Sequence, residues 1–296
     1  MSVKRLVAGV AVLLVALTSA CSSGSATPAA GDSASSKPVK IGVADGAEPY
    51  WQVYKQKAKD EGIDVEFVNF GDYNQPNPAL SQGQLDLNEF QHLQYLAQYN
   101  VENNDTLTPI GATAVYPLPL YSSKHKSPEE IPADGKVAIP NDPTNQARAL
   151  LVLQSAGLIT LKDGGTSLST PAEITDAKVT VVPIDASQTA QNLPSVEAAV
   201  ENNNYATAAK LTKDNIIYAD DVNADQYKPY INAFVSRAAD KDNPTYRKLA
   251  DLYHDPEVEA AIRKDLGDDG VFKTNTPEDL QATLTEIQNN ISAAGK

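Results

Sequence analysis

Two stretches that alternate strand and helix patterns constrain the fold of this chain more than any other feature. In the first, "VKIGVA" (residues 39–44) and "DVEFVNF" (64–70) have the patterns of buried strands, and "EPYWQVYKQKAKDEG" lies between them. Pro49 near the start of this helix and Gly62 just past its end are typical of those two positions. The order predicts a βαβ unit with parallel strands and a right-handed crossover.

The second stretch repeats the alternation between residues 136 and 184. "KVAIP" and "KVTVVPI" are predicted strands, and "NDPTNQARALLVLQSAGLI" is the helix between them. Asp142 suits the N-cap, Pro143 the first helical position and Gly157 the C-terminal stop. Further along the chain, we predict a helix in "SVEAAVENNNYATAA" and strands in "DNIIYAD" and "YINAFVSR".

The C-terminal part of the chain is predicted to be helical. "NPTYRKLADLYH", "DPEVEAAIRKDLG" and "TPEDLQATLTEIQNNI" each begin with a capping residue followed by proline. The last of them carries one apolar stripe at helical spacing: Leu280, Leu284, Ile287 and Ile291. We expect these helices to pack on the first α/β block and not to form a third domain.

A chain of 296 residues is long enough for two lobes. We predict that residues 38–121 together with 229–296 form lobe one, and that residues 122–228 form lobe two. The chain then crosses between the lobes twice, near Tyr121 and near Pro229. Such an arrangement leaves a cleft between two α/β lobes, which is the usual place for a small ligand.

The N-terminus has the pattern of an export signal. Lys4 and Arg5 precede an apolar run that is long enough for a signal peptide and too short to span a membrane comfortably. "LTSAC" follows and resembles a lipobox, with Thr18 where leucine is usual. We therefore predict a signal peptide in residues 1–20 and lipidation of Cys21, the only cysteine. The alternative is a plain secretory signal with an incidental cysteine.

Residues 21–37 are predicted to be a lipidated, flexible tether that fastens the protein to a membrane. The segment after Cys21 is rich in Ser, Ala and Gly and lacks large apolar side chains, so burial cannot offset the entropy of ordering it. The net charge of −14 gives a pI near 4.6. An acidic surface repels phosphate backbones, which argues against nucleic acid as a partner.

Four rings are concentrated in "NEFQHLQYLAQYN": Phe90, His92, Tyr95 and Tyr99. They are either ordinary core residues of a helix or the lining of a pocket. Phe90 and His92 are two residues apart, so on a helix they point in different directions. They can face one site only at a turn or a helix start, for which Asn88 is a plausible cap.

"PNDPTNQARALL" is the most specific feature for ligand binding. The N-terminus of a helix attracts anions through its unpaired amides and its dipole. Arg148, in the second turn, adds a guanidinium suited to a carboxylate. The alternative is a well-capped helix whose arginine pairs with an acidic neighbour, and the local sequence favours neither interpretation.

Catalytic and metal-binding patterns are missing from the sequence. The three histidines are scattered, and no zinc, P-loop or nucleophile-elbow motif is present. "DLGDDG" lacks the ligand spacing of a calcium loop. We therefore predict no metal, no cofactor and no catalytic residue, although acid–base pairs among the 38 carboxylates keep an enzyme possible.

The quoted motifs, together with "FGDYNQPNPALSQGQLDLNEFQHLQYL", "VYPLPLYS" and "AAVENNNYA", resemble the methionine-binding lipoproteins of NlpA type that serve ABC importers. The resemblance covers roughly residues 40–255. It implies an α/β, two-lobed periplasmic-binding-protein-like fold (type II) with a cleft between the lobes and two crossing segments. It also implies ligand-binding residues: Tyr73, Phe90, His92 and Tyr95 around the side chain, Arg148 on the carboxylate, and the polar Asn202.

The function implied is capture of methionine, or a close small apolar amino acid, and delivery to an ABC permease with its ATPase subunits. The protein would be lipid-anchored on the outer face of the cytoplasmic membrane and would not be an enzyme. One departure from the family is the first loop, where Tyr50 and Trp51 either reach the cleft or pack in the core. A surface interaction lipoprotein and a small-molecule enzyme on the same fold are the alternatives.

Overall fold

The computed structural model describes residues 37–222 and 225–295. The predicted signal peptide, Cys21 and the tether up to residue 36 lie outside the described residues. The fold below is that of the unit formed by residues 37–296. In the described part of the chain, no helix combines the length and the apolar character that crossing a membrane requires.

The first sheet has five strands in the order β2 (Val65–Asn69), β1 (Val39–Val43), β3 (Leu87–Glu89), β13 (Ala233–Ser236) and β4 (Thr108–Ala112). Strand β1 is parallel to β2 and β3, and β13 is antiparallel to β3 and β4. Helix α1 (Tyr50–Asp60) connects β1 to β2 as predicted, and Gly62 after it has a φ of +77°. The predicted βαβ unit is therefore confirmed.

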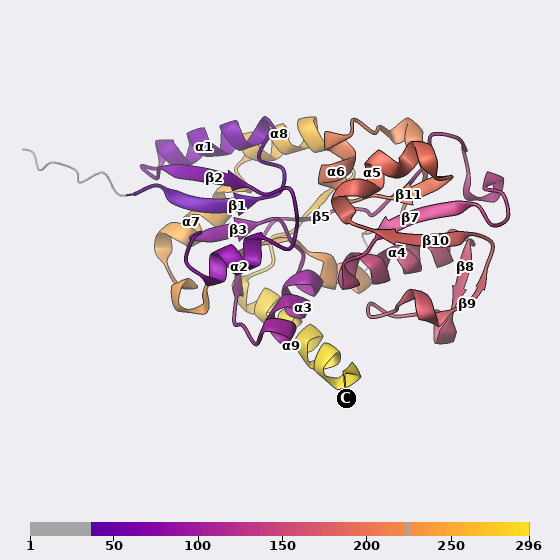
Figure 1. The fold of residues 1–296 in the computed structure, drawn as a ribbon. Coiled ribbons are helices and arrows are strands. Elements are labelled where there is room, and N and C mark those ends of the chain that lie inside the picture. The colour runs from indigo at the N-terminus through magenta and orange to yellow at the C-terminus, as the bar shows by residue number, and fades with distance from the viewer. Residues whose placement is uncertain (1–36, 223–224, 296) are drawn as a thin grey trace, which may run out of the picture. The chain divides into compact units, whose positions relative to one another are not determined.

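Helices cover both faces of this sheet (Figure 1): α2 (Pro76–Ser81), α3 (Leu93–Asn103), α7 (Pro244–Leu252), α8 (Pro256–Leu266) and α9 (Pro277–Ala294), in addition to α1. Helix α9 packs against α3 and β4, and α8 packs against α1. The predicted apolar stripe of α9 is confirmed, because Leu280, Leu284 and Ile287 are buried in one core cluster and Ile291 packs against it.

The second sheet has the order β10 (Thr180–Ile184), β7 (Lys136–Pro140), β11 (Ala198–Val200), β6 (Leu120–Tyr121) and β12 (Ile216–Tyr218). Strand β7 is parallel to β10 and β11, and β6 is antiparallel to β11 and β12. Helix α4 (Pro143–Ser155) follows β7, with Asp142 as its N-cap and Gly157 at a φ of +72° beyond its end. The residues predicted to start and end this helix are therefore confirmed.

Shorter elements complete the fold: β5 (Ala114–Val115) pairs with β14 (Val271–Phe272), β8 (Ile159–Leu161) pairs with β9 (Ile174–Ala177), and α5 (Thr189–Asn192) and α6 (Asn203–Ala208) flank β11. The predicted helix over residues 195–209 is wrong in its first half, which contains β11, and only Asn203–Ala208 is α-helical. Ala198, Ala199 and Val200 are fully buried in the central strand of the second sheet. A strand covered on both faces is apolar throughout, so its residues show no alternation.

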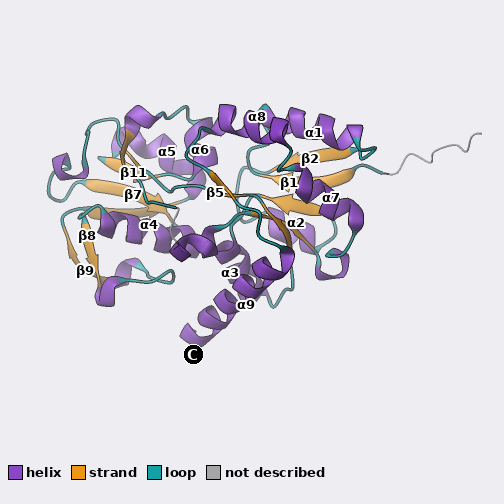
Figure 2. Cartoon of the chain, turned by 180° about the vertical axis from the view of Figure 1, so that it is seen from behind, coloured by secondary structure: helices purple, strands orange, loops and turns teal. Residues whose placement is uncertain are grey.

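The two sheets define two lobes, which Figure 2 shows side by side. The chain passes between them twice, before β6 and after β12. The molecule thus has the predicted two-lobed α/β fold, with separate core clusters under each sheet. The lobe boundaries stay a prediction. Because Leu120 and Tyr121 pair within the second sheet, we place the first crossing just before Leu120.

Candidate functional site

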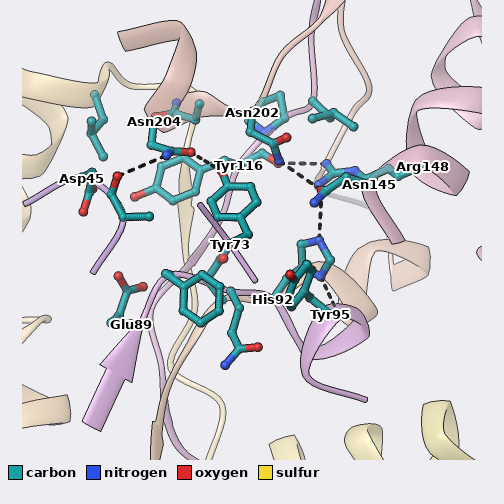
Figure 3. A pocket seen from close by; sticks show the side chains of 18 of the residues that line it. Asp45, Tyr73, Glu89, His92, Tyr95, Tyr116, Asn145, Arg148, Asn202 and Asn204 are labelled. Atoms are coloured by element: carbon teal, nitrogen blue, oxygen red, sulfur yellow. Dashed lines mark hydrogen bonds between the residues drawn. The ribbon is translucent and has the colours of Figure 1, made fainter. Parts of the chain in front are cut away.

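A pocket between the lobes brings together all the residues expected to bind a ligand (Figure 3): Tyr73, Phe90, His92, Tyr95, Arg148 and Asn202. It holds about 760 Å³ of empty space, which includes solvent at its mouth. The ligand-binding role of these residues stays a prediction.

The turn between β3 and α3 explains how Phe90 and His92 reach the same pocket. His92 is the N-cap of α3, with extended backbone, and its Nδ1 accepts a hydrogen bond from the amide of Tyr95 at 3.1 Å. The expected cap at Asn88 is wrong. Asn88 lies in β3, fully buried, and donates to Asn77 Oδ1 at 2.9 Å. The two rings lie outside regular helix, so helical geometry does not separate them.

Three of the rings form an apolar wall. The ring centroids of Tyr73 and Phe90 are 6.0 Å apart, those of Phe90 and Tyr95 are 5.8 Å apart, and those of Tyr73 and Tyr95 are 6.2 Å apart. Two of the three pairs meet edge to face, which is a favourable arrangement. Tyr99 instead packs against the core cluster beneath α3.

Arg148 lies in α4 and is held by a buried ion pair. Its Nη2 donates to Asp220 Oδ2 at 2.8 Å and to the carbonyl of Tyr116 at 2.9 Å, and its guanidinium carbon lies 4.4 Å from the ring of Tyr230. The arginine thus pairs with an acidic residue and also lines the pocket. Among the described residues no acceptor bonds to Nη1, which leaves this donor for a ligand.

A network of amides lies next to Arg148. Asn145 donates to Asp142, and its Oδ1 accepts from Asn202 Nδ2 at 3.1 Å and from His92 Nε2 at 3.3 Å. The proton of the neutral His92 ring is on Nε2, because Nδ1 is the acceptor for Tyr95. Burial, and then the charge of Arg148, lower the pKa of His92 to about 3. The ring is therefore neutral at neutral pH.

One acceptor beside this network has no partner. Asn202 Oδ1 is buried and forms no hydrogen bond among the described residues. An unsatisfied buried acceptor is costly, because the group has lost its hydrogen bonds with water. Asn202 also lines the pocket, close to the guanidinium of Arg148 in Figure 3. This position offers an acceptor to the amino group of a ligand whose carboxylate contacts the arginine.

The N-terminus of α6 reaches across the pocket from the second lobe to the first. Tyr73 donates its hydroxyl proton to Asn204 Oδ1, and Asn204 Nδ2 donates to the carbonyl of Ala44 at 3.4 Å. Tyr205 donates to the carbonyl of Gly71 at 3.2 Å, and its ring centroid is 4.9 Å from that of Tyr73. These contacts hold the two lobes together over the pocket.

The sequence reasoning missed several lining residues, among them Asn145, Asn204, Asp45 and Glu89. The positions of these residues on a predicted helix face and at the ends of predicted strands could have indicated them. Asn145 is three residues before Arg148 and so lies on the same face of the helix. Asp45 follows β1 and Glu89 ends β3, and the carboxyl ends of adjacent parallel strands meet at one edge of a sheet.

The two aromatic residues of the first loop have different positions. Tyr50 lines the pocket. Trp51 is fully buried in the core of the first lobe, and its ring centroid is 4.6 Å from that of Phe67.

In the described ranges, no three His, Cys, Asp or Glu side chains are placed to hold a metal ion. The pocket therefore offers hydrogen bonds, charge and apolar surface to a ligand.

A family model described as NlpA lipoprotein matches residues 39–275. The chain belongs to the NlpA lipoprotein family. The D-methionine-binding lipoprotein MetQ of Escherichia coli strain K12 is 41% identical over 234 residues, which are 76% of this chain and 84% of that protein. The resemblance seen in the sequence motifs is thereby confirmed.

Solved structures of similar proteins agree with this NlpA assignment. A nutrient-binding protein from Burkholderia cenocepacia, solved bound to methionine, is 39% identical with a TM-score of 0.74, and the match covers 79% of this chain and 99% of that one. Protein PG110 from Staphylococcus aureus is 38% identical with a TM-score of 0.80, and the match covers 84% and 99%.

Proposed function

We propose that this NlpA-family protein is the substrate-binding protein of an ABC importer, and that it binds methionine or a close small apolar amino acid between its lobes. The observation that carries the proposal is a single pocket lined by Arg148 and by the ring wall of Tyr73, Phe90 and Tyr95. The relatives support it, because one is named for D-methionine binding and another was solved with methionine.

Each part of an amino acid has a partner in this pocket. The carboxylate would accept from Arg148 Nη1, and the ammonium would donate to Asn202 Oδ1. The thioether would pack against the rings, since sulfur interacts favourably with aromatic edges. Burying such a side chain contributes about 2 kcal/mol, and a charge-assisted hydrogen bond adds about 1.5–3 kcal/mol.

The geometry supports binding better than catalysis. Both ring nitrogens of His92 are already hydrogen-bonded, and its lowered pKa makes it a weak base. We therefore infer that the protein performs no reaction on its ligand. Incubation of the purified protein with amino acids, followed by mass spectrometry, tests this inference, and a new product would favour the enzyme alternative.

Methionine should bind with one molecule per protein chain. Native mass spectrometry of the protein as purified should show an added mass equal to that of its ligand. Calorimetry with both enantiomers of methionine should then give a Kd and a stereochemical preference. An absence of heat with all twenty amino acids, in either configuration, would contradict the proposal and favour an interaction lipoprotein with a degenerate pocket.

We also propose that the protein is lipid-anchored through Cys21 on the outer face of the cytoplasmic membrane, where it delivers its ligand to a permease with ATPase subunits. Replacing Cys21 with serine should move the protein from the membrane fraction to the soluble fraction, because no thiol remains for acylation. Fractionation followed by immunoblotting measures this shift. A C21S variant that stays in the membrane fraction would show that the anchor lies elsewhere.

A further inference from the structure

Two carboxyl groups line the pocket at the edge of the first sheet. Asp45 follows β1, and Glu89 is the last residue of β3, where it pairs in register with Val43 of β1. Glu89 is only 7% exposed. In Figure 3 both carboxyl groups lie at one end of the drawn pocket, while Arg148 and Asn145 lie at the other. The pocket thus has an acidic end as well as a basic one.

Neighbouring side chains fix the orientation of both carboxyl groups. Asp45 accepts from the hydroxyl of Tyr50 at 2.6 Å and from Trp51 Nε1 at 2.8 Å. Glu89 Oε1 accepts from Thr113 at 3.0 Å. Among the described residues, Glu89 Oε2 has no hydrogen-bond partner, and no cationic side chain pairs with either acid. Burial raises the pKa of both carboxyl groups, and a cation bound beside them would favour their ionised forms.

The acidic end is separated from Arg148 by a ring. The carbonyl of Tyr116 accepts from Arg148, while the hydroxyl of Tyr116 lies 3.3 Å from that of Tyr253, next to the acids. A ligand whose α-carboxylate contacts Arg148 keeps its α-ammonium at the basic end, where Asn202 Oδ1 is unpartnered among the described residues. We therefore expect the ligand's side chain, and not its α-amino group, to face Asp45 and Glu89.

We propose that Asp45 and Glu89 form a cation-binding subsite, through which the pocket accepts, besides the apolar amino acids of the proposed function, amino acids whose side chain ends in a protonated amine. The inference rests on the proposed function, because it assumes that Arg148 holds the α-carboxylate. Aromatic faces around the acids suit such a ligand, since rings contact its methylene groups and also stabilise an ammonium. The pocket-lining rings near the acids are Tyr50, Tyr116 and Tyr253.

Lysine and norleucine test the subsite, because norleucine is lysine without its terminal amine. Calorimetry at pH 8 should show that the wild-type protein binds lysine at least tenfold more tightly than norleucine. Replacing Glu89 with glutamine keeps the shape of the side chain and removes its charge. In E89Q the ratio of the two affinities should fall at least tenfold, whereas the control Glu66→Gln, on the exposed surface of β2, should leave the ratio unchanged.

The dependence on pH is a second readout. Burial, and then Asp45, raise the pKa of Glu89 to about 8, and a bound ammonium favours the ionised carboxylate. Lysine affinity should therefore rise between pH 6 and pH 8.5, while norleucine affinity should not. The other titratable groups that face Glu89 have pKa values above their ordinary range and stay neutral: Tyr50, Tyr54, Tyr116 and Tyr253.

The outcomes separate this inference from the proposed function. If methionine and norleucine bind and lysine binds no better, or if E89Q leaves the ratio within twofold, the acidic subsite is wrong and the amino-acid pocket stands. If none of the three ligands binds, the proposed function fails and the subsite with it. Thermal unfolding checks that E89Q is folded. If E89Q does not fold, Asp45→Asn takes its place in the experiment, and it should also lower the ratio of the lysine and norleucine affinities.

Discussion

Replacement of Arg148 by alanine should weaken methionine binding at least tenfold, or about 1.4 kcal/mol, and lower the free energy of unfolding by about 3–5 kcal/mol. The binding loss follows from removing the donor for the ligand's carboxylate. The stability loss follows because Asp220, whose side chain is 6% exposed, is left as a buried charge without its partner. Calorimetry measures the first effect and denaturant unfolding measures the second.

A double variant separates the two effects. Replacing Asp220 with asparagine in the R148A background removes the unpaired charge, so most of the stability should return while binding stays weak. Arg247→Ala is the matched control, because Arg247 also pairs with an aspartate, Asp242, but on the surface and away from the pocket. It should cost less than about 1 kcal/mol. Unchanged methionine affinity in R148A would remove Arg148 from the site.

The second large effect concerns Glu201, which is fully buried beside the pocket residue Asn202. Its Oε2 accepts from Thr189 at 2.5 Å, and its Oε1 has no partner among the described residues. Burial raises the pKa of Glu201 to about 8. In the unfolded chain the pKa of Glu201 is near 4.5. Between that pH and pH 8 the folded state binds more protons than the unfolded state, so the free energy of unfolding falls as pH rises.

Glutamine at position 201 should therefore flatten the pH dependence of stability. At pH 9, Glu201→Gln should be more stable than the wild type by on the order of 5 kcal/mol, because every tenfold change in a protonation equilibrium corresponds to about 1.4 kcal/mol. At pH 5, where the buried acid is protonated, the two should differ little. Urea unfolding at pH 5, 7 and 9 measures the difference.

Glu197 provides a contrast in the same segment of chain. Its hydrogen bond with His125 and its contact with Lys124 lower its pKa, so its charge contributes stability above pH 5. Glu197→Gln should therefore not gain stability at high pH. If E201Q and the wild type lost stability in parallel between pH 5 and pH 9, the carboxyl of Glu201 would not be protonated in the folded protein.

Capping residues followed by proline correctly predicted where several helices begin, because a helix start depends on residues that are close in sequence. The helix starts at Asp142, Asn243, Asp255 and Thr276 each have a capping side chain followed by proline, and each is an N-cap in the structure. Residues 198–200 could not be assigned correctly in this way. Alanine and valine between polar residues suit a short buried strand as well as a helix, and only pairing with β6 and β7 decides the outcome.

The candidate site was predictable in part, because its residues lie in motifs that resemble a known family. What the motifs could not show is which side chains pair with one another. Asp220 is 72 residues from Arg148 in sequence, and Asn204 is 131 residues from Tyr73. Such partners depend on how the two lobes close. The acidic end escaped notice for the same reason, since Asp45 and Glu89 become neighbours only when β1 and β3 pair.

The bonds that Asn204 and Tyr205 make across the pocket have a kinetic consequence for transport. Opening of the lobes breaks the three hydrogen bonds that these two residues make with the first lobe: Tyr73 to Asn204, Asn204 to Ala44, and Tyr205 to Gly71. The residence time of a bound ligand therefore depends on how fast these bonds between the lobes break, as well as on the contacts that the ligand itself makes.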